Sequence, residues 1–375
     1  MVRLWSNEGL YMQEVSINTP VEAITRQRRA FSTMRAATLS AYLEQQKQNI
    51  STPTLLSLNG WGDWLERKEL PAVHLPHVLV PEAATTIMRS GGYWLCLGGV
   101  GIVINPGQEF LNRFHEAGLH MWDINHVIVT DSQKSSSIDL EPLWNFNREM
   151  NSLLKEWQLT PHTISYWLHP ESFERYIPVL RPTSREERDS IHRLQPFPEN
   201  NPFETVEFTP QLHLDFCATH AHTMVRLRSD EEQVGCLFHA PYEPLQTEFL
   251  SPCSLLLLGM GESTYEEIST LEPSENTLGL AGVAKILKGS SARLALISEQ
   301  GFSEGDTRIE SLKKLRTEIP SLPILPTEIG ARYHLDSLSM SGPGVQTPIP
   351  IGAVRSMRRA GPFSELTFCD DVSIL

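Results

Sequence analysis

The sequence predicts an α/β (α+β) fold in which two β-sheets pack face to face with helices on their outer sides. The chain has 375 residues, of which 40% are hydrophobic, so it can bury a large core. Short apolar runs rich in β-branched residues alternate with helix-forming segments. Because this succession occurs once in each half of the chain, it indicates a two-sheet sandwich covered by helices.

The first elements of the predicted sandwich are a β-hairpin and a short helix. Tyr93–Leu97 and Val100–Ile104 are apolar runs separated by two glycines, and Asn105-Pro106-Gly107 ends the second run. The helix is expected over Glu109–Ala117 and ends at Gly118.

Three more elements complete the first half. His126–Thr130 is a continuous β-branched run, which is typical of a buried strand. A helix is expected from Asp139 to Trp157, with apolar residues at helical spacing, and a further strand over Thr163–Trp167.

The second half begins after a segment rich in Pro, Arg and Glu. This segment, Pro170–Pro202, is expected to be a long surface loop or a partly helical insertion. Strands and helices then resume. The expected strands are Phe203–Phe208, Met224–Arg228, Gln233–Phe238, Ser254–Leu258 and Leu294–Ile297, and the expected helices are Leu278–Lys288 and Asp306–Thr317.

The two ends of the chain are expected to lie outside the sandwich. Residues 1–64 are predicted to be an N-terminal helical extension, because Val21–Gln48 has helix-forming composition without an internal Gly or Pro. Asn59-Gly60-Trp61-Gly62 then breaks this pattern. Residues 65–338 form the expected sandwich domain, and residues 339–375 form the expected polar C-terminal tail.

The charge balance argues against a nucleic-acid partner. The formal net charge is −14, whereas binding phosphates requires a local excess of Lys and Arg. The one local exception is Arg26–Arg35, which holds four arginines and no acidic residue in ten positions. Such a run is more often a solvated helix face than a nucleic-acid contact.

Cysteine usage and hydropathy predict a cytoplasmic protein without a membrane segment. The five cysteines include no CxxC pair, which favours reduced thiols. No apolar run approaches the roughly 20 residues that span a bilayer, and the N-terminus lacks the apolar core of a signal peptide. The cysteines are Cys96, Cys217, Cys236, Cys253 and Cys369.

Four segments, in chain order, carry a resemblance to a known family. Ile102–Gly107, a helix and then Asp123–Thr130 resemble the turn, helix and strand that precede the metal motif of the metallo-β-lactamase superfamily. Val234–His239 is similar to the later strand that ends in the metal-bridging Asp, and Ala292–Glu299 to the strand that ends at the last His. The resemblance covers about residues 70–335 and implies a four-layer αββα sandwich.

The first metal motif of that family is absent. Where family members carry His-x-His-x-Asp-His, this chain has Asp131, Gln133, Ser135 and Ser136. A Gln carbonyl and two hydroxyls are weak ligands for zinc, which prefers imidazole, thiolate and carboxylate. The resemblance therefore implies a scaffold that has lost its first set of ligands.

The later metal positions have also changed. By resemblance, His239 replaces the bridging Asp, Glu299 lies near the last His, and Thr277 lies near a place where some relatives have another His. The loss therefore extends over both halves of the sandwich.

Some polar groups remain from which a non-standard site could be built. His220 or His222 lies on the segment that supplies a middle His ligand in active relatives. The alternative to an empty site is a rebuilt metal site for zinc or manganese, with candidate ligands Asp131, His220, His222, His239 and Glu299.

Other catalytic motifs receive no support. The chain has no Gly-x-Ser-x-Gly turn of the kind that exposes a serine nucleophile. Gly259-Met-Gly261 lacks the third glycine and the lysine of a phosphate-binding loop, and is interpreted as a turn at the end of a strand.

The leading hypothesis is a catalytically inactive member of this fold that serves as a binding or scaffold subunit. Catalysis in the family depends on metal-activated water, so loss of the ligands removes that route. We therefore expect no catalytic residue and no cofactor. A protein partner is expected, either a second copy or an active paralogue, as the resemblance implies.

Two other functions remain open at the level of sequence. One is a metal-dependent hydrolase of phosphodiesters or esters that uses the rebuilt site. The other is a small-molecule sensor that uses the vacated cleft.

Overall fold

A computed structural model describes most of the predicted sandwich. The described residues are 2–4, 13–15, 33, 37, 38, 41, 52–59, 91–182, 188, 190–198, 203–218, 222–261, 263–272, 274–299, 308–327, 329–342, 348–351, 356–359 and 366–369. Within the helix predicted over Val21–Gln48, Thr33, Ala37, Thr38 and Ala41 are helical and exposed. The rest of that prediction lies outside the described residues.

One large sheet has nine strands and contains the predicted hairpin. Tyr93 pairs with Ile104 and Leu97 with Val100, in antiparallel register, and the strands from β5 to β8 are parallel. The strand order is β18 (Ile349–Pro350), β17 (Ser339–Ser341), β16 (Arg332–His334), β3 (Thr54–Ser57), β4 (Tyr93–Leu97), β5 (Val100–Ile104), β6 (His126–Val129), β7 (Ile164–Leu168) and β8 (Ile191–Pro196).

The second large sheet has seven strands. Its strands from β9 to β12 are antiparallel, and those from β12 to β15 are parallel. The strand order is β15 (Ile324–Pro326), β14 (Leu294–Ser298), β13 (Leu255–Gly259), β12 (Gln233–Leu237), β11 (Thr223–Ser229), β10 (Leu212–Ala218) and β9 (Glu204–Thr209).

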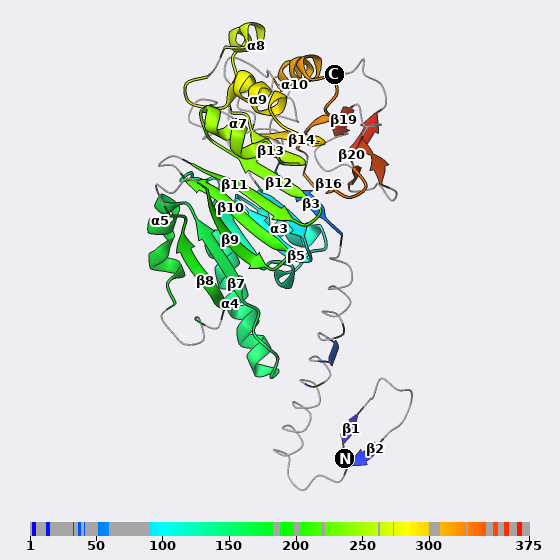
Figure 1. The fold of residues 1–375 in the computed structure, drawn as a ribbon. Coiled ribbons are helices and arrows are strands. Elements are labelled where there is room, and N and C mark those ends of the chain that lie inside the picture. Colours follow the sequence, from blue (N-terminus) through cyan, green and yellow to red (C-terminus); the bar gives the residue numbers. More distant parts are fainter. Residues whose placement is uncertain are drawn as a thin grey trace, which may run out of the picture.

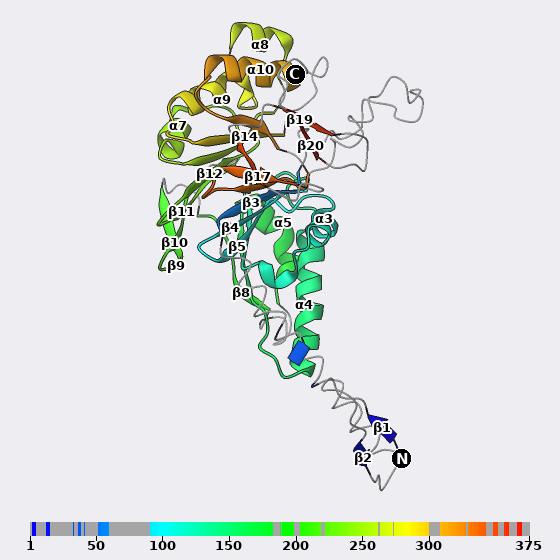
Figure 2. The same ribbon diagram turned by 90° about the vertical axis from the view of Figure 1, so that its right-hand side faces the viewer.

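Helices cover the outer face of each sheet. Figure 2 shows α3 (Phe110–Glu116), α4 (Leu140–Glu156) and α5 (Pro170–Leu180) together on one side of the nine-stranded sheet, where the short 3-10 helix η1 (Met121–Asp123) also lies. In Figure 1, helices gather on the other sheet near β13 and β14, namely α7 (Pro244–Leu250), α8 (Tyr265–Thr270), α9 (Gly279–Lys288) and α10 (Arg308–Glu318). None of the helices in the described part of the chain is long and apolar enough to cross a membrane.

Two small hairpins complete the described elements. They are formed by β1 (Val2–Leu4) with β2 (Gln13–Val15), and by β19 (Ser356–Arg359) with β20 (Leu366–Cys369).

The hydrophobic core has three parts, which follow from the alternation of side chains along each strand. In β4, Tyr93 and Leu95 face the other sheet, whereas Trp94 packs against Phe114 of α3. In β13, Leu257 lies between the sheets and Leu258 lies under the helices. The expected four-layer αββα sandwich is therefore confirmed.

Both expected domain boundaries cut through the nine-stranded sheet. β3 lies before residue 65, yet it pairs with β4 on one side and β16 on the other. β17 and β18 lie beyond residue 338 and continue the same sheet, with Met340 fully buried. The polar tail expected at residues 339–375 is corrected over β17 and β18, because Met340 and Ile351 lie in the core.

Two expectations in the middle of the chain also need correction. Pro170–Pro202 was expected to be a surface loop or a partly helical insertion. It contains the helix α5 and also the strand β8, which lies at the edge of the nine-stranded sheet. Two of its prolines occupy tolerated positions, since Pro170 lies in the first turn of α5 and Pro196 ends a strand at a sheet edge, whereas Pro178 lies inside α5. β10 was not predicted, although Leu212, Leu214 and Phe216 alternate with polar residues as in a half-buried strand.

His126 gives the fold a testable dependence on pH. Its ring stacks on Phe208 with a centroid distance of 3.7 Å. Burial lowers the pKa of His126 to about 4, and the charges of His192 and Arg193 act in the same direction. The folded protein therefore keeps this ring neutral where the unfolded chain, with a pKa of about 6.5, takes up a proton. Its contribution to stability is fully present above pH 6.5 and is lost as the pH falls towards 4.

We predict that His126→Phe reduces the pH dependence of the unfolding free energy between pH 6.5 and pH 4. Phenylalanine retains the ring contact with Phe208 and removes the titration. Between pH 6.5 and 4 the wild-type protein should lose about 2 to 3 kcal/mol of unfolding free energy through His126, and the variant should not lose this part. Urea denaturation at several pH values measures the difference, and identical slopes for the two proteins would contradict the assignment.

Candidate functional site

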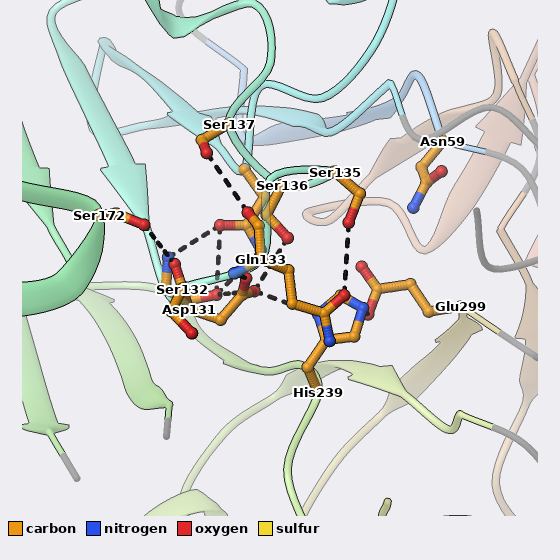
Figure 3. Close-up of polar contacts among 12 residues, drawn as sticks. Asn59, Asp131, Ser132, Gln133, Ser135, Ser136, Ser137, Ser172, His239 and Glu299 are labelled. Carbon is orange, nitrogen blue, oxygen red and sulfur yellow. Dashed lines mark hydrogen bonds and ion pairs between the residues drawn. The ribbon is translucent and has the colours of Figure 1, made fainter. Parts of the chain in front are cut away.

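The candidate site forms where three strands end. Asp131 follows β6 of the nine-stranded sheet, whereas His239 follows β12 and Glu299 follows β14 of the seven-stranded sheet. Because β12, β13 and β14 are parallel neighbours, their carboxyl ends open at the same edge of the sheet. Figure 3 shows the side chains of Asp131 and Glu299 on either side of the His239 ring.

His239 bridges the two carboxylates. Its Nδ1 lies 3.1 Å from Oδ2 of Asp131, and its Nε2 lies 3.4 Å from Oε2 of Glu299. The three side chains are buried, with exposed fractions of 9% for His239, 1% for Asp131 and 7% for Glu299. The Nδ1 contact is a hydrogen bond, and the Nε2 contact is short enough for an ion pair when the ring is protonated. We call Asp131, His239 and Glu299 the carboxylate–imidazole bridge.

Asp131 is the most highly bonded member of the bridge. Its carboxylate accepts hydrogen bonds from the backbone N–H of Gln133 at 2.9 Å and from the hydroxyl of Ser136 at 3.0 Å. Ser172, in the first turn of α5, donates to the backbone carbonyl of Asp131 at 2.8 Å. Burial alone would raise the pKa of Asp131, but the charge of His239 and these hydrogen bonds outweigh it and lower that pKa.

The residues at the first-motif positions therefore form hydrogen bonds with one another. Ser136 and the backbone of Gln133 bind Asp131, and the hydroxyl of Ser135 donates to the Gln133 side-chain oxygen at 3.4 Å. Ser135 and Ser136 are buried, whereas the side chain of Gln133 is exposed. The structure thus brings together Asp131, Gln133, Ser135 and Ser136 in one polar cluster, in contact with His239.

His222 lies beside this cluster from the other sheet. It forms an isolated bridge with Asp131, and the backbone N–H of Thr223 donates to the carbonyl of Thr130 at 2.6 Å. His222 is 2% exposed. Burial lowers its pKa to about 4, helped by the charge of His169 and opposed by that of Asp131. His222 is therefore a neutral ring at physiological pH.

The backbone at the strand ends is shaped to present these groups. His239 and Glu299 have positive φ angles of 47° and 51°, and Asn105, in the turn after β5, has a φ of 50°. Non-glycine residues rarely adopt this conformation, and such strain concentrates at sites where a side chain must be aimed. A side chain on Gly259 would place its Cβ 2.4 Å from Oε2 of Glu299, so glycine leaves the space that this carboxylate occupies.

Two neighbours of the site were not expected from the sequence. The phenol of Tyr93, on β4, accepts a hydrogen bond from the Asn59 side chain at 3.0 Å. Burial raises the pKa of Tyr93, and the negative charge of Glu299 raises it further, so the phenol stays neutral next to the bridge. Asn59 could not be found from sequence, because nothing local marks its contact with a residue 34 positions away.

No protein-family model matches the sequence, and no curated protein matches it. Solved structures do match. The metallo-beta-lactamase fold protein YhfI from Bacillus subtilis is 14% identical, with a TM-score of 0.54, and the match covers 75% of this chain and 99% of that one. The chain has the metallo-β-lactamase fold.

Two further structures support the same fold. A diphosphatase of the PhnP family is 12% identical with a TM-score of 0.50, over 75% of this chain and 96% of that chain. Zn(2+)-bound PqqB from Methylobacterium extorquens is 10% identical with a TM-score of 0.51, over 74% of this chain and 99% of that chain. At these identities the likeness establishes the architecture alone.

The described residues do not fit the metal centre that the metallo-β-lactamase fold implies. Among them, no group of three or more His, Cys, Asp or Glu side chains is arranged to hold a metal ion. In the carboxylate–imidazole bridge, both nitrogens of His239 face carboxylates, whereas a ligating imidazole turns a lone pair towards the metal.

Thr277, another expected position, does not join the bridge. Thr277 hydrogen-bonds Ser274 at 3.1 Å and lies against Gly261, whose backbone N–H donates to the carbonyl of Glu299. Its location is therefore adjacent to the strand end and not among the bridging groups. His220 lies outside the described residues.

We predict that removing the His239 side chain strongly lowers the free energy of unfolding. His239→Ala would leave two buried carboxylates without the cation between them, and breaking a buried pair in this way costs about 3 to 5 kcal/mol of unfolding free energy. Gln133→Ala is the matched control, because this neighbouring side chain is exposed, and it should change stability by no more than about 0.5 kcal/mol. Chemical denaturation near neutral pH measures both.

A thermodynamic cycle with three substitutions then isolates the bridge itself. If Asp131→Asn and Glu299→Gln neutralise the carboxylates first, His239→Ala should cost clearly less than it does in the wild-type protein. Equal costs in both backgrounds, or a cost near zero in the wild type, would mean that these groups line an open cleft without pairing.

Proposed function

We propose that this metallo-β-lactamase-fold protein is a non-catalytic binding or scaffold subunit, in other words a pseudoenzyme. The observation that carries the proposal is the position of the His239 imidazole between Asp131 and Glu299. Both nitrogens of the ring face a carboxylate, at 3.1 and 3.4 Å.

The chemistry available to these residues supports the proposal. Metal-dependent hydrolysis needs a cation that generates hydroxide at neutral pH and polarises the scissile group. Here the acidic side chains that could attract such a cation are already compensated by an internal one. The hydroxyl of Ser136 donates to Asp131, so it is oriented towards a carboxylate and not activated as a nucleophile by an imidazole.

The retained scaffold suits a binding role. The two sheets enclose a continuous core, and the carboxylate–imidazole bridge links the strand ends of one sheet to the other. Among the described residues, the buried thiols of Cys217, Cys236 and Cys253 form no disulfide, which supports the cytoplasm as the compartment. A partner protein or a second copy would then use the outer surface.

Metal analysis tests the proposal directly. Protein expressed in medium supplemented with zinc, manganese and iron, and purified without chelator, should contain far less than one equivalent of any of them. Its thermal midpoint should be the same with and without a chelator, because a ligand that binds only the native state would raise it. A tightly bound equivalent of metal, with hydrolysis of a phosphodiester or ester, would overturn the proposal in favour of a rebuilt hydrolase site.

A single substitution provides the matched positive control for that experiment. His239→Asp removes the imidazole and places three carboxylates together, from Asp131, residue 239 and Glu299. The free energy of unfolding of this variant should fall by several kcal/mol. It should recover when zinc or manganese is added, since a divalent cation compensates the repelling charges. A variant with the same free energy of unfolding as the wild type, unchanged by added zinc or manganese, would contradict the assigned role of His239.

A further inference from the structure

Helix α4 carries an apolar stripe on its outer face. Phe146 and Leu153 are 44% and 50% exposed, and Met150 between them is partly buried. With Trp157 at the end of the helix, they are spaced by four, three and four positions, so they lie on one face along three turns. We call Phe146, Met150, Leu153 and Trp157 the α4 stripe.

The stripe continues into a row of rings and has an acidic border. Phe146 packs edge-on against His115 with a centroid distance of 5.5 Å, and His115 lies 6.0 Å from His120. Along the helix, Glu149 and Glu156 are exposed and are seven positions apart. An apolar surface on the outer face of a helix whose other apolar face is already buried in the core is typical of a protein–protein contact.

A segment of the same chain has the complementary pattern. Arg28 and Arg35 are also seven positions apart, with Phe31 and Met34 between them. On two helices, both pairs of charges are separated by about 10 Å, so one register satisfies both ion pairs. The segment Arg26–Arg35 holds four arginines and no acidic residue, which makes it the most basic stretch noted in the sequence.

The location of the stripe suits this segment. β3 begins at Thr54 and runs in the same direction as β6. This follows because β3 is antiparallel to β4, β4 is antiparallel to β5, and β5 is parallel to β6. At this end of the sheet, Asn151 of α4 hydrogen-bonds the backbone of His162, just before β7. The chain therefore enters the sheet at the end where the second half of α4 lies, and in Figure 1 this part of α4 extends beyond the strands.

We propose that the protein forms a homodimer in which Val21–Gln48 of each copy docks on the α4 stripe of the other. A second copy is favoured over the same chain because Thr38, seven positions after Phe31 and four after Met34 and so on the same face of a helix, is exposed within one molecule. Reciprocal docking closes the assembly at two copies, as in a two-fold symmetric dimer. The proposal gives the binding role suggested above a partner, but it does not depend on the state of the metal site.

Light scattering of the full chain tests the assembly. The wild-type protein should have twice the mass of one chain, and Phe146→Asp with Leu153→Asp should convert it to a monomer with an unchanged circular dichroism spectrum. Val179→Asp on α5 is the matched control, because Val179 is 43% exposed but lies outside the stripe, and this variant should remain a dimer. A monomeric wild type, or a stripe variant that stays dimeric, would overturn the proposal.

Charge exchange tests the identity of the occupant. Glu149→Lys with Glu156→Lys should give a monomer, and so should Arg28→Glu with Arg35→Glu. An equimolar mixture of these two variants should recover the dimer, because each segment then meets a stripe of opposite charge. Failure of the mixture to dimerise would exclude Val21–Gln48 as the occupant, whereas metal content and hydrolysis would be unaffected by either result.

Discussion

The structure depends on one compact interaction, an imidazole placed between two buried carboxylates. Asp131 comes from the nine-stranded sheet, whereas His239 and Glu299 come from the seven-stranded sheet. Buried carboxylates are costly unless a cation or several hydrogen bonds compensate them. In a metallo-β-lactamase fold the usual compensation is a metal ion, and in this chain the side chain of His239 is placed to provide it.

The surroundings of the bridge are consistent with this substitution. Ser136 and the backbone N–H of Gln133 donate hydrogen bonds to Asp131, at positions that the sequence resemblance matches to the first metal motif. Gly259 leaves space for the carboxylate of Glu299, and both His239 and Glu299 adopt positive φ angles that aim their side chains at each other. Under the proposed function, the changed first-motif residues and the imidazole between the carboxylates would be parts of one rearranged site.

The sequence predicted the fold well because its signals are local. Two continuous apolar runs separated by glycines identified β4 and β5, and helical spacing identified α4. The edge elements were missed or misassigned, since β8 and β17 depend on neighbouring strands for their definition and not on their own composition. The bridge could be only partly anticipated. The family resemblance placed Asp131, His239 and Glu299 near one cleft, but His239 and Asp131 are 108 positions apart, and their pairing follows from sheet register that no local pattern encodes.

The protonation state of His239 tests the central claim most directly. Nitrogen-15 NMR of histidine-labelled protein, with His239→Gln used to assign the signals, reports whether each ring nitrogen carries a proton. At neutral pH both nitrogens of His239 should be protonated, with slowly exchanging N–H groups, and added zinc should leave their shifts unchanged. A neutral ring, or a zinc-induced shift of one nitrogen in a one-to-one complex, would show that His239 is an available metal ligand and would contradict the account.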